Sequence, residues 1–430
     1  MTMIIAFMLL GLILLIILNV PIGISLALVG AIAMFASYGV DALPNIALTM
    51  FEGATNFPLL AIPLFILAGA IMNASSISRR LINLASAMLG FIKGGLSMVT
   101  IGSSIFFAEI SGSSVAGVAA LGSVLIPAMK KKGYSKEFSA AISSSAATLA
   151  IILPPSIPMI LYAVISGESV VKMFVAGILP GIIGAMGLAG MSYYLAVRNN
   201  YPSEGRFQAS VLWTAFKEAA WALLIPVVIL GGIFGGLVTA TEGAGLAVVV
   251  ALFVSAVIYR EFNLRTLWKA CIEGGIQTAV VMLLVASSAL IGVYLTETQL
   301  PQQLAGSIAD ITNNKYVVLA LLNVLFLILG MFLHSAAAII LVVPIVLPLV
   351  VAVGIDPLHF GIIVTLNLAI GQQTPPVASV LIAACSIAKA DIWKTTWVNL
   401  WFIGVLFAVL MVNTYLPDVA LVLVRVFYGS

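Results

Sequence analysis

Charged side chains are scarce in this sequence. Asp, Glu, Lys and Arg together make up 8% of the 430 residues, whereas hydrophobic residues make up 63%. Soluble domains carry about 25% charged and about 45–50% apolar residues, so this chain has too few charges to cover a surface that faces water. The composition therefore excludes a soluble enzyme, a disordered chain and a protein that binds nucleic acid.

Cysteine, histidine and catalytic motifs are also rare or missing. The two cysteines, Cys271 and Cys385, match no metal or redox spacing, and we interpret them as small apolar residues. The HExxH motif of metalloproteases and the GxSxG motif of serine hydrolases do not occur. An intramembrane hydrolase could pair Ser113 or Ser114 with His334, but nothing in the sequence holds these residues within reach. We therefore expect that the chain is not an enzyme.

Long apolar runs follow one another from end to end of the chain. A membrane-spanning helix needs roughly 20 apolar residues, whereas outer-membrane barrels show short alternating segments. The pattern therefore predicts an all-α polytopic membrane protein that lies in a lipid bilayer. The apolar segments are 3–18, 20–38, 58–74, 94–130, 137–166, 169–197, 221–239, 241–259, 275–296, 315–351, 359–388 and 397–424.

Turn-forming residues recur at a constant offset of 221 residues. Backbone geometry outlasts side-chain identity, so matches that concentrate in such residues predict a diverged structural repeat; coincidence among abundant residues is the alternative. The offset pairs Glu52 with Glu273, Gly53 with Gly274, Ser114 with Ser335, Pro127 with Pro348, Gly133 with Gly354, and the dipeptide 154–155 with 375–376.

The positive charges predict that the two halves have opposite orientations. Lysines 130–132 and Lys136 follow Pro127, whereas the matching loop 351–356 after Pro348 contains neither Lys nor Arg. Cytoplasmic loops carry an excess of Lys and Arg, so the first loop is expected in the cytoplasm and the second outside. Five crossings in each half satisfy this inverted topology, because an odd number inverts the next repeat.

Two segments, 94–130 and 315–351, must then enter and leave the membrane on the same face. Each has a small polar break in its middle, at 110–114 and 333–336. Two half-depth helices joined at such a break would form a re-entrant hairpin; two full crossings in each segment are the alternative. The re-entrant arrangement leaves 15 of the 18 Lys and Arg residues in the cytoplasm, and those outside are Lys172, Lys315 and Arg425.

Two proline pairs, 154–155 and 375–376, interrupt long apolar spans. Proline cannot continue a helix but fits its first turn, so one half-helix should end before each pair and another should start at it. The carbonyl end carries partial negative charge and suits a small cation, whereas the N-terminal end suits a carboxylate. Paired breaks at matching positions of two halves point to the binding site of a transporter.

The coupling ion can be inferred from the side chains near these breaks. A proton-driven carrier needs a titratable relay, for which Glu109 and His334 are the candidates, whereas a Na⁺-driven carrier needs only oxygen ligands. The sequence favours Na⁺; a proton-coupled organic-anion carrier remains the alternative, and His359 is expected in a loop that faces water. The neutral oxygens near the breaks belong to Ser143, Ser144, Ser145, Thr148, Asn367 and Thr374, although such serines also serve helix packing.

Four motifs resemble a known family along essentially the whole chain. They resemble the large membrane (M) subunit of tripartite ATP-independent periplasmic (TRAP) transporters, most closely the sialic-acid type, and C4-dicarboxylate carriers share them. The motifs are FAEISGSS at 107–114, LIPAMK at 125–130, ILPPSIP at 152–158 and GQQTPPV at 371–377.

The resemblance implies a Na⁺-driven elevator importer of a carboxylate in a bacterial inner membrane. It implies a small four-helix membrane partner (Q) and a soluble periplasmic binding protein (P) that delivers N-acetylneuraminate or a C4-dicarboxylate. It also implies a fixed scaffold, two arms and a moving transport domain. The scaffold would be 1–77 and 199–296, the arms 78–93 and 297–314, and the transport domain 94–198 and 315–430.

The same resemblance suggests where substrate and ions bind. The substrate carboxylate would lie at Ser156 and Val377, with hydroxyls of Ser113, Ser114, Ser335 and Thr374 nearby. Two or more Na⁺ ions would lie between the hairpin tips and the breaks, with no organic cofactor. Their expected ligands are Ser111, Gly112, Ser113, Ser114, Ser145, Thr148, Leu153, Leu333, His334, Asn367, Gly371 and Gln373.

Overall fold

The structure is a computed structural model, and all regular structure in its described residues is helical. It describes residues 20–111, 113–261, 263–299 and 314–429, with isolated positions between 7 and 18 and between 302 and 306. Within this part of the chain, eleven helical stretches are long and apolar enough to cross a membrane. The expected all-α polytopic class is thereby confirmed.

The described part of the first half contains two short 3₁₀ segments (η1 and η2), a π-helical segment (η3) and eleven α-helices. They are α2 (Ile22–Tyr38), η1 (Gly39–Asp41), α3 (Ala42–Ala54), η2 (Phe57–Leu60), α4 (Ala61–Ala74), α5 (Ile77–Leu89), α6 (Gly95–Ser111), α7 (Ser114–Gly117), η3 (Val118–Gly122), α8 (Ser123–Lys131), α9 (Lys136–Ala147), α10 (Leu149–Ile152), α11 (Ile157–Ser166) and α12 (Val170–Arg198). The segments α6 and α7–α8 form the two arms of the first hairpin.

The second half continues with longer helices and one further π-helical segment, η4. Its described elements are α13 (Ala209–Phe234), α14 (Ala240–Phe253), η4 (Val254–Ile258), α15 (Leu264–Glu297), α17 (Lys315–Phe332), α18 (Ser335–Ala352), α19 (Pro357–Gly371), α20 (Ser379–Ala388), α21 (Ile392–Tyr415) and α22 (Pro417–Tyr428). Here α17 and α18 are the arms of the second hairpin.

The two halves match at the predicted offset. α9 begins at Lys136 and α19 begins 221 residues later at Pro357, and the starts of α7 and α18 have the same spacing. Just before α9 and α19, Gly133 and Gly354 both adopt positive φ angles, of 87° and 72°. Such angles favour glycine because it has no Cβ. The structure therefore confirms the repeat, including the turn geometry at the base of each hairpin.

The hairpin arms are longer than the half-depth helices that we expected. α6 has 17 residues, and α17 and α18 have 18 residues each. At 1.5 Å per residue such an arm is about 26 Å long, close to the thickness of the bilayer core of about 30 Å. The polar breaks in the sequence locate the tips, whereas the apolar residues on either side set the arm length.

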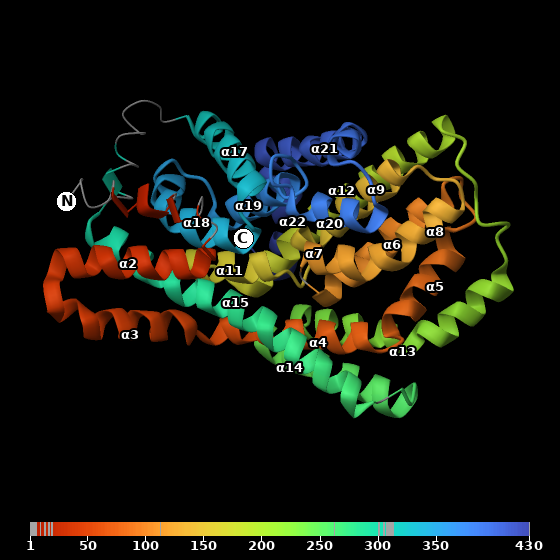
Figure 1. The fold of residues 1–430 in the computed structure, drawn as a ribbon, viewed down its shortest axis with the longest axis horizontal. Helices are drawn as coiled ribbons and strands as arrows, with labels where there is room; N and C mark the ends of the chain where they lie inside the picture. The colour runs from red at the N-terminus through yellow and green to blue at the C-terminus, as the bar shows by residue number, and fades with distance from the viewer. Residues whose placement is uncertain are drawn as a thin grey trace.

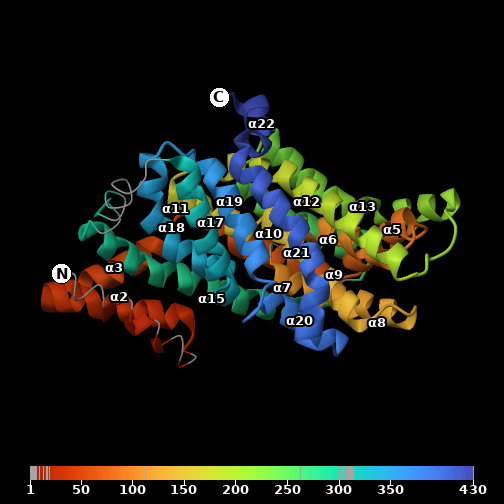
Figure 2. The ribbon, with the colours of Figure 1, turned by 90° about the horizontal axis from the view of Figure 1, so that it is seen from above.

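In Figure 1 the helices form two groups, one below the other, and both extend along the long axis of the molecule; Figure 2 views the same helices from above. In the first group α15 packs against α2, α3 and α4, and α14 packs against α4 and α13. In the second group α9 packs against α20 and α21, α17 packs against α19, and α12 packs against α21 and α22. The arm helix α5 contacts α13 of the first group and α6 of the second, so it bridges the two.

An aromatic cluster fixes the base of the first hairpin. The rings of Tyr134 and Tyr201 stack with centroids 4.4 Å apart, and the Tyr134 hydroxyl donates a hydrogen bond of 3.0 Å to the Pro202 carbonyl. Burial raises the pKa of Tyr134 to about 12, so this phenol stays a donor at neutral pH. Lys132 and Glu204 add an ion pair of 3.2 Å. Loop 199–208 is thereby held against the hairpin base.

We predict that cysteines placed at Lys131 and Val351 react with impermeant thiol reagents from opposite faces of the membrane. The two positions lie near the ends of the returning hairpin arms α8 and α18, and an inverted repeat puts these ends on opposite sides. The measurement is labelling in right-side-out and inside-out vesicles, with Cys271 and Cys385 replaced by Ser. Labelling of both positions from one face would refute the inverted topology.

Candidate functional site

Both proline pairs interrupt their spans, as the sequence predicts. α10 ends at Ile152 and α11 begins at Ile157, while α19 ends at Gly371 and α20 begins at Ser379. The peptide bonds within both proline pairs are cis. Two carbonyl ends and two N-terminal ends are therefore exposed inside the helical bundle.

Two glycines allow α12 to lie directly against the first break. A Cβ on Gly177 would come within 2.5 Å of the Ile152 carbonyl oxygen, and one on Gly181 within 2.4 Å of the Leu153 side chain. Small residues let membrane helices approach closely. The position of the carbonyl end of α10 therefore depends on the small-residue face of α12.

A buried oxygen cluster joins α9, α21 and the second break. The Ser145 hydroxyl oxygen lies 2.6 Å from the side-chain oxygen of Gln373 and 2.8 Å from that of Asn399. The Thr148 hydroxyl, 3.4 Å from the Gln373 amide nitrogen, donates to the Ser145 carbonyl. All four residues are fully buried. The Asn399 amide nitrogen also donates to the Gln373 side-chain oxygen, at 3.2 Å, so the single proton of the Ser145 hydroxyl is free to bond the Asn399 oxygen. Three uncharged side-chain oxygens thus lie together in a buried site, where a small cation could use them as ligands.

The tip of the first hairpin is bonded to the break of the other repeat. The Ser114 hydroxyl, 1% exposed, donates a hydrogen bond of 2.9 Å to the side-chain oxygen of Gln372. Ser113 caps α7 by accepting from the Ala116 amide. The π-helical segment η3 packs against α20, and in the second hairpin α18 packs against α11. Each returning arm thus meets the half-helix that follows the opposite proline pair.

Several buried polar atoms around this junction have no hydrogen-bond partner among the described residues. They include the hydroxyl oxygens of Ser143 and Ser144, the amide nitrogen of Gln372 and the side-chain oxygen of Asn367. A buried polar group without a partner costs about 1–3 kcal/mol. Unpaired hydroxyl and amide oxygens are candidate ligands for a Na⁺ ion.

A second polar chain connects α19, α17 and α21. The Asn367 amide nitrogen donates to the Asn323 side-chain oxygen at 2.7 Å and to the Ile363 carbonyl at 2.8 Å. The Asn323 amide nitrogen donates in turn to the Thr414 hydroxyl at 3.1 Å. Asn367 therefore belongs to a helix-bridging network and has one side-chain oxygen left over.

The expectation that His359 faces water in a loop is wrong. It lies in the first turn of α19 and is 2% exposed. Its Nε2 atom is 2.6 Å from the Asn413 carbonyl oxygen on α21. The loop ends three residues earlier, because Asp356 caps α19 by accepting from the amides of Leu358 and His359.

Comparison with known proteins identifies the chain. Residues 9–419 match the family described as the tripartite ATP-independent periplasmic transporter, DctM component. The chain belongs to the DctM family. It is therefore a transporter subunit rather than an enzyme, and a multi-pass protein of the inner membrane.

Individual DctM relatives differ in what they are named for. The isethionate TRAP transporter permease protein DctMQ of Oleidesulfovibrio alaskensis is 40% identical over 93% of this chain but only 63% of that relative. The C4-dicarboxylate large permease DctM of Pseudomonas aeruginosa is 37% identical over 93% of both chains. The sialic acid permease SiaT of Haemophilus influenzae is 35% identical over 85% of this chain and 59% of its own length.

A solved structure shares the fold. The Alcanivorax borkumensis YdaH transporter aligns with a TM-score of 0.60 over 91% of this chain and 90% of its own. The sequence identity of 14% limits this likeness to the architecture.

The structure places the DctM-motif residues of the first break as follows. Leu153 directly follows α10 and its backbone is extended. Ser156 is fully buried, and its hydroxyl donates to the Ile151 carbonyl at 2.7 Å. The Ser156 hydroxyl thus satisfies one of the carbonyl groups that have no hydrogen-bond partner within the helix at the end of α10.

The residues of the second break are more open. The Thr374 hydroxyl donates to the Ile370 carbonyl at 2.8 Å, and the amide of Val380 donates to the Gln372 carbonyl. The Val377 side chain is 42% exposed. Of the two positions expected to receive a carboxylate, Val377 is the accessible one.

The two hairpin tips are described to different extents. Leu333 follows α17, His334 is exposed, and Ser335 begins α18 with 1% exposure. Gly112 and the side chains of Glu109 and Ser111 lie outside the described residues.

Sequence reasoning missed three buried amides. Gln372, Asn399 and Asn323 all take part in the networks above, and each is at most 4% exposed. The signal was available, because Asn323 and Asn399 are isolated amides within apolar segments, where a polar side chain needs a partner. Gln372 was overlooked beside Gln373, although the two side chains point to different partners.

Proposed function

We propose that this chain is the permease subunit of a Na⁺-coupled, binding-protein-dependent importer of a small carboxylate. The observation that carries the proposal is the buried cluster of Ser145, Gln373 and Asn399, which contains three close oxygens and no charged side chain. It lies at the carbonyl end of α19, and half-helix carbonyl ends are groups with which secondary transporters coordinate Na⁺. Two or more Na⁺ ions would bind at the two breaks.

The proposed cargo is an organic acid, either N-acetylneuraminate or a C4-dicarboxylate. Relatives named for C4-dicarboxylates and for sialic acid support this, and the relative named for isethionate, a sulfonate, widens the class to small organic anions. The substrate carboxylate would be held by the N-terminal end of α20 near Val377, because free backbone amides attract anions. Ser113, Ser114 and Ser335 would supply hydroxyls from the hairpin tips.

The proposed partners are a small membrane subunit (Q) and a soluble periplasmic binding protein (P). The tripartite and periplasmic terms of the family description support them. The relative named DctMQ is also longer than this chain, as a fusion with a small subunit would be.

The proposed mechanism is an elevator with a scaffold, two arms and a transport domain. Hydrogen bonds between helices of the same part support this division. Ser37 and Tyr294 join α2 to α15 in the scaffold, and Ser97 and Ser192 join α6 to α12 in the transport domain. We place the change from the transport domain to the scaffold at α13 rather than at residue 199, because Tyr134 and Lys132 hold loop 199–208 to the hairpin base.

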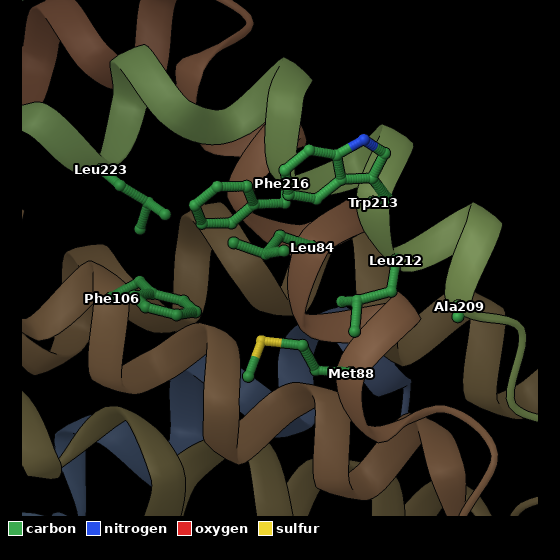
Figure 3. Close-up of a pocket in the computed structure, with 8 residues that line it drawn as sticks. All are labelled: Leu84, Met88, Phe106, Ala209, Leu212, Trp213, Phe216 and Leu223. Carbon is green, nitrogen blue, oxygen red and sulfur yellow. The ribbon is translucent and has the colours of Figure 1, made fainter.

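The seam between the arm, the first hairpin and α13 supports such a movement. Figure 3 shows Leu84 and Met88 of α5, Phe106 of α6 and Phe216 of α13 around one space. This apolar groove has a volume of 480 Å³. Apolar contacts are non-directional, so helices can slide along such a seam without breaking hydrogen bonds. Trp213 stacks on Phe216 at its rim.

The ion gradient would supply enough energy for accumulation. Two Na⁺ ions with one monoanion carry one net positive charge, and moving one charge down 100 mV supplies about 2.3 kcal/mol. A factor of ten in concentration corresponds to about 1.4 kcal/mol. The electrical term alone would therefore support an accumulation of roughly fortyfold, and the Na⁺ gradient adds to it.

The test is uptake into proteoliposomes that contain the membrane subunits and the binding protein. We expect uptake of radiolabelled N-acetylneuraminate or succinate to require Na⁺ outside and to stop when choline replaces it. Isethionate completes the substrate panel. Uptake that is independent of Na⁺ and driven by a pH gradient alone would refute the Na⁺ proposal in favour of the proton-coupled alternative.

A further inference from the structure

A polar pocket of 290 Å³ separates the first hairpin from α4 and α15. Its volume is close to the lower limit of about 300 Å³ for small-molecule sites. It is distinct from the buried oxygen cluster, because its lining comes from α4 and α15, and among the described residues of the hairpin only Ala116 reaches it. The residues that matter here are Asn73 of α4, Thr266, Lys269, Glu273 and Gln277 of α15, and Ala116 of α7.

The pocket leads inward from the cytoplasmic end of α15. Thr266 lies in the first turn of α15, and Gln277 lies about 16 Å further along the axis at 1.5 Å per residue. Arg260 and Arg265 flank this end, and such positive charge marks the cytoplasmic side. Ala116, two residues after the tip residue Ser114, closes the wall on the hairpin side. The pocket therefore connects the cytoplasm with the hairpin tip.

The second hairpin is packed more tightly at the matching position. Ala116 is half-buried, whereas Ala337, its equivalent at the offset of 221 residues, is 1% exposed. The two hairpins thus differ in packing although they are repeats of one another. The pocket opens beside the first hairpin, where Ala116 lines it. An alternating-access carrier that is open to the cytoplasm has this asymmetry.

Lys269 places an unpaired positive charge in this pocket. Its side chain is exposed, and it forms no ion pair within the part of the chain that the structure describes. Glu273 lies one helical turn further along α15 and is likewise unpaired there. Amide groups of Asn73 and Gln277 line the same space. An ammonium with neutral hydrogen-bonding groups is a recognition set for a carboxylate or sulfonate.

We propose that Lys269 forms a cytoplasmic release site for the organic anion. The anion that leaves the hairpin tip pairs with Lys269 while Asn73 and Gln277 bond its polar groups. The Glu273 carboxylate repels the same anion and keeps binding weak, and a site on a transport path must bind weakly enough to let go. The release site rests on the proposed direction of transport, but its charge can be tested without transport.

The test is the reaction of a cysteine at Gln277 with charged thiol reagents, in a Cys271→Ser background. The reagents are the anionic methanethiosulfonate ethylsulfonate and its cationic trimethylammonium counterpart, applied to inside-out vesicles. In Lys269→Gln we expect the anionic reagent to react about threefold more slowly and the cationic one about threefold faster, from one charge at about 12 Å (eight residues of helix) and an effective dielectric constant of about 40. Lys269→Arg should restore both rates.

Lys394→Gln is the matched control, because this exposed lysine lies on α21, which packs against α9 and α12 rather than α15. It should leave both rates unchanged. Succinate and isethionate should slow the labelling when Lys269 is present and fail to do so in Lys269→Gln. Equal rates in all variants, or labelling only from the periplasmic face, would overturn the release site. A failure of Na⁺-dependent uptake with these labelling results intact would refute only the Na⁺ coupling.

Discussion

Replacing Gln373 with Leu is expected to abolish Na⁺-driven uptake and to weaken Na⁺ binding by about tenfold or more, which is about 1.4 kcal/mol or more. The Gln373 side-chain oxygen lies within hydrogen-bonding distance of both Ser145 and Asn399. Leucine removes this oxygen and leaves two buried polar partners without it. The loss therefore affects the ligand set and the joint between α9, α21 and the second break together.

Na⁺ binding can be measured without transport. A ligand that binds the folded protein stabilises it, by about 2.7 kcal/mol at a concentration of 100 times its Kd. Wild-type protein in detergent should therefore unfold at a higher temperature in NaCl than in choline chloride. Gln373→Leu should lose this Na⁺-specific shift while retaining a cooperative transition.

Ser145→Ala makes the prediction specific to the cluster. Residues in one hydrogen-bond network show coupling energies of about 0.5–3 kcal/mol in double-mutant cycles, so the two substitutions together should cost less than the sum of their separate effects. Thr365→Val is the control, because this buried threonine of α19 donates only to the Ile362 carbonyl of its own helix. A full Na⁺-specific shift in Gln373→Leu would show that the ion binds elsewhere.

The fold was predictable from the sequence where backbone geometry depends on single residues. Gly133 and Gly354 mark turns with positive φ, and the proline pairs mark where helices end. Proline fixes φ, and glycine permits the positive φ that other residues avoid, so the spacing of these residues carries through to the helix boundaries. The depth of the hairpins was not predictable in this way, because it depends on the lengths of the apolar arms on either side of the break.

The candidate site was only partly predictable, because its contacts join the two repeats. Ser145 and Gln373 are 228 residues apart, and Ser114 and Gln372 are 258 residues apart. The repeat offset predicts which elements correspond but not which elements touch. The sequence pattern therefore indicated hydroxyls at the first break and amides at the second, and only the packing shows that they share one cluster.

Gly371→Ala is expected to reduce uptake by more than tenfold, although it adds only one methyl group. A Cβ on Gly371 would lie 2.6 Å from the Gly330 backbone on α17. In return, a Cβ on Gly330 would lie 3.0 Å from the Gly371 Cα atom. The two helices therefore touch through backbone atoms three residues before the second hairpin tip begins at Leu333.

The clash cannot be relieved by a change of rotamer, because the neighbouring atoms belong to the backbone. Inserting a methyl group into such a contact typically costs about 1–3 kcal/mol and displaces the backbone. The displacement would separate α17 from α19 at the point where the hairpin tip and the second break meet. Gln372 and Gln373 directly follow Gly371, so the oxygen cluster would move with it.

Gly404→Ala provides the matched control on α21. A Cβ there would meet nothing within 4 Å, and alanine is favoured over glycine in a helix by about 1 kcal/mol. We expect this variant to keep wild-type uptake and to unfold at the same or a higher temperature. Both variants are measured for uptake and for the Na⁺-specific thermal shift. If Gly371→Ala transported as well as Gly404→Ala, the contact between α17 and α19 would not position the site, because α17 could withdraw without moving the ion ligands.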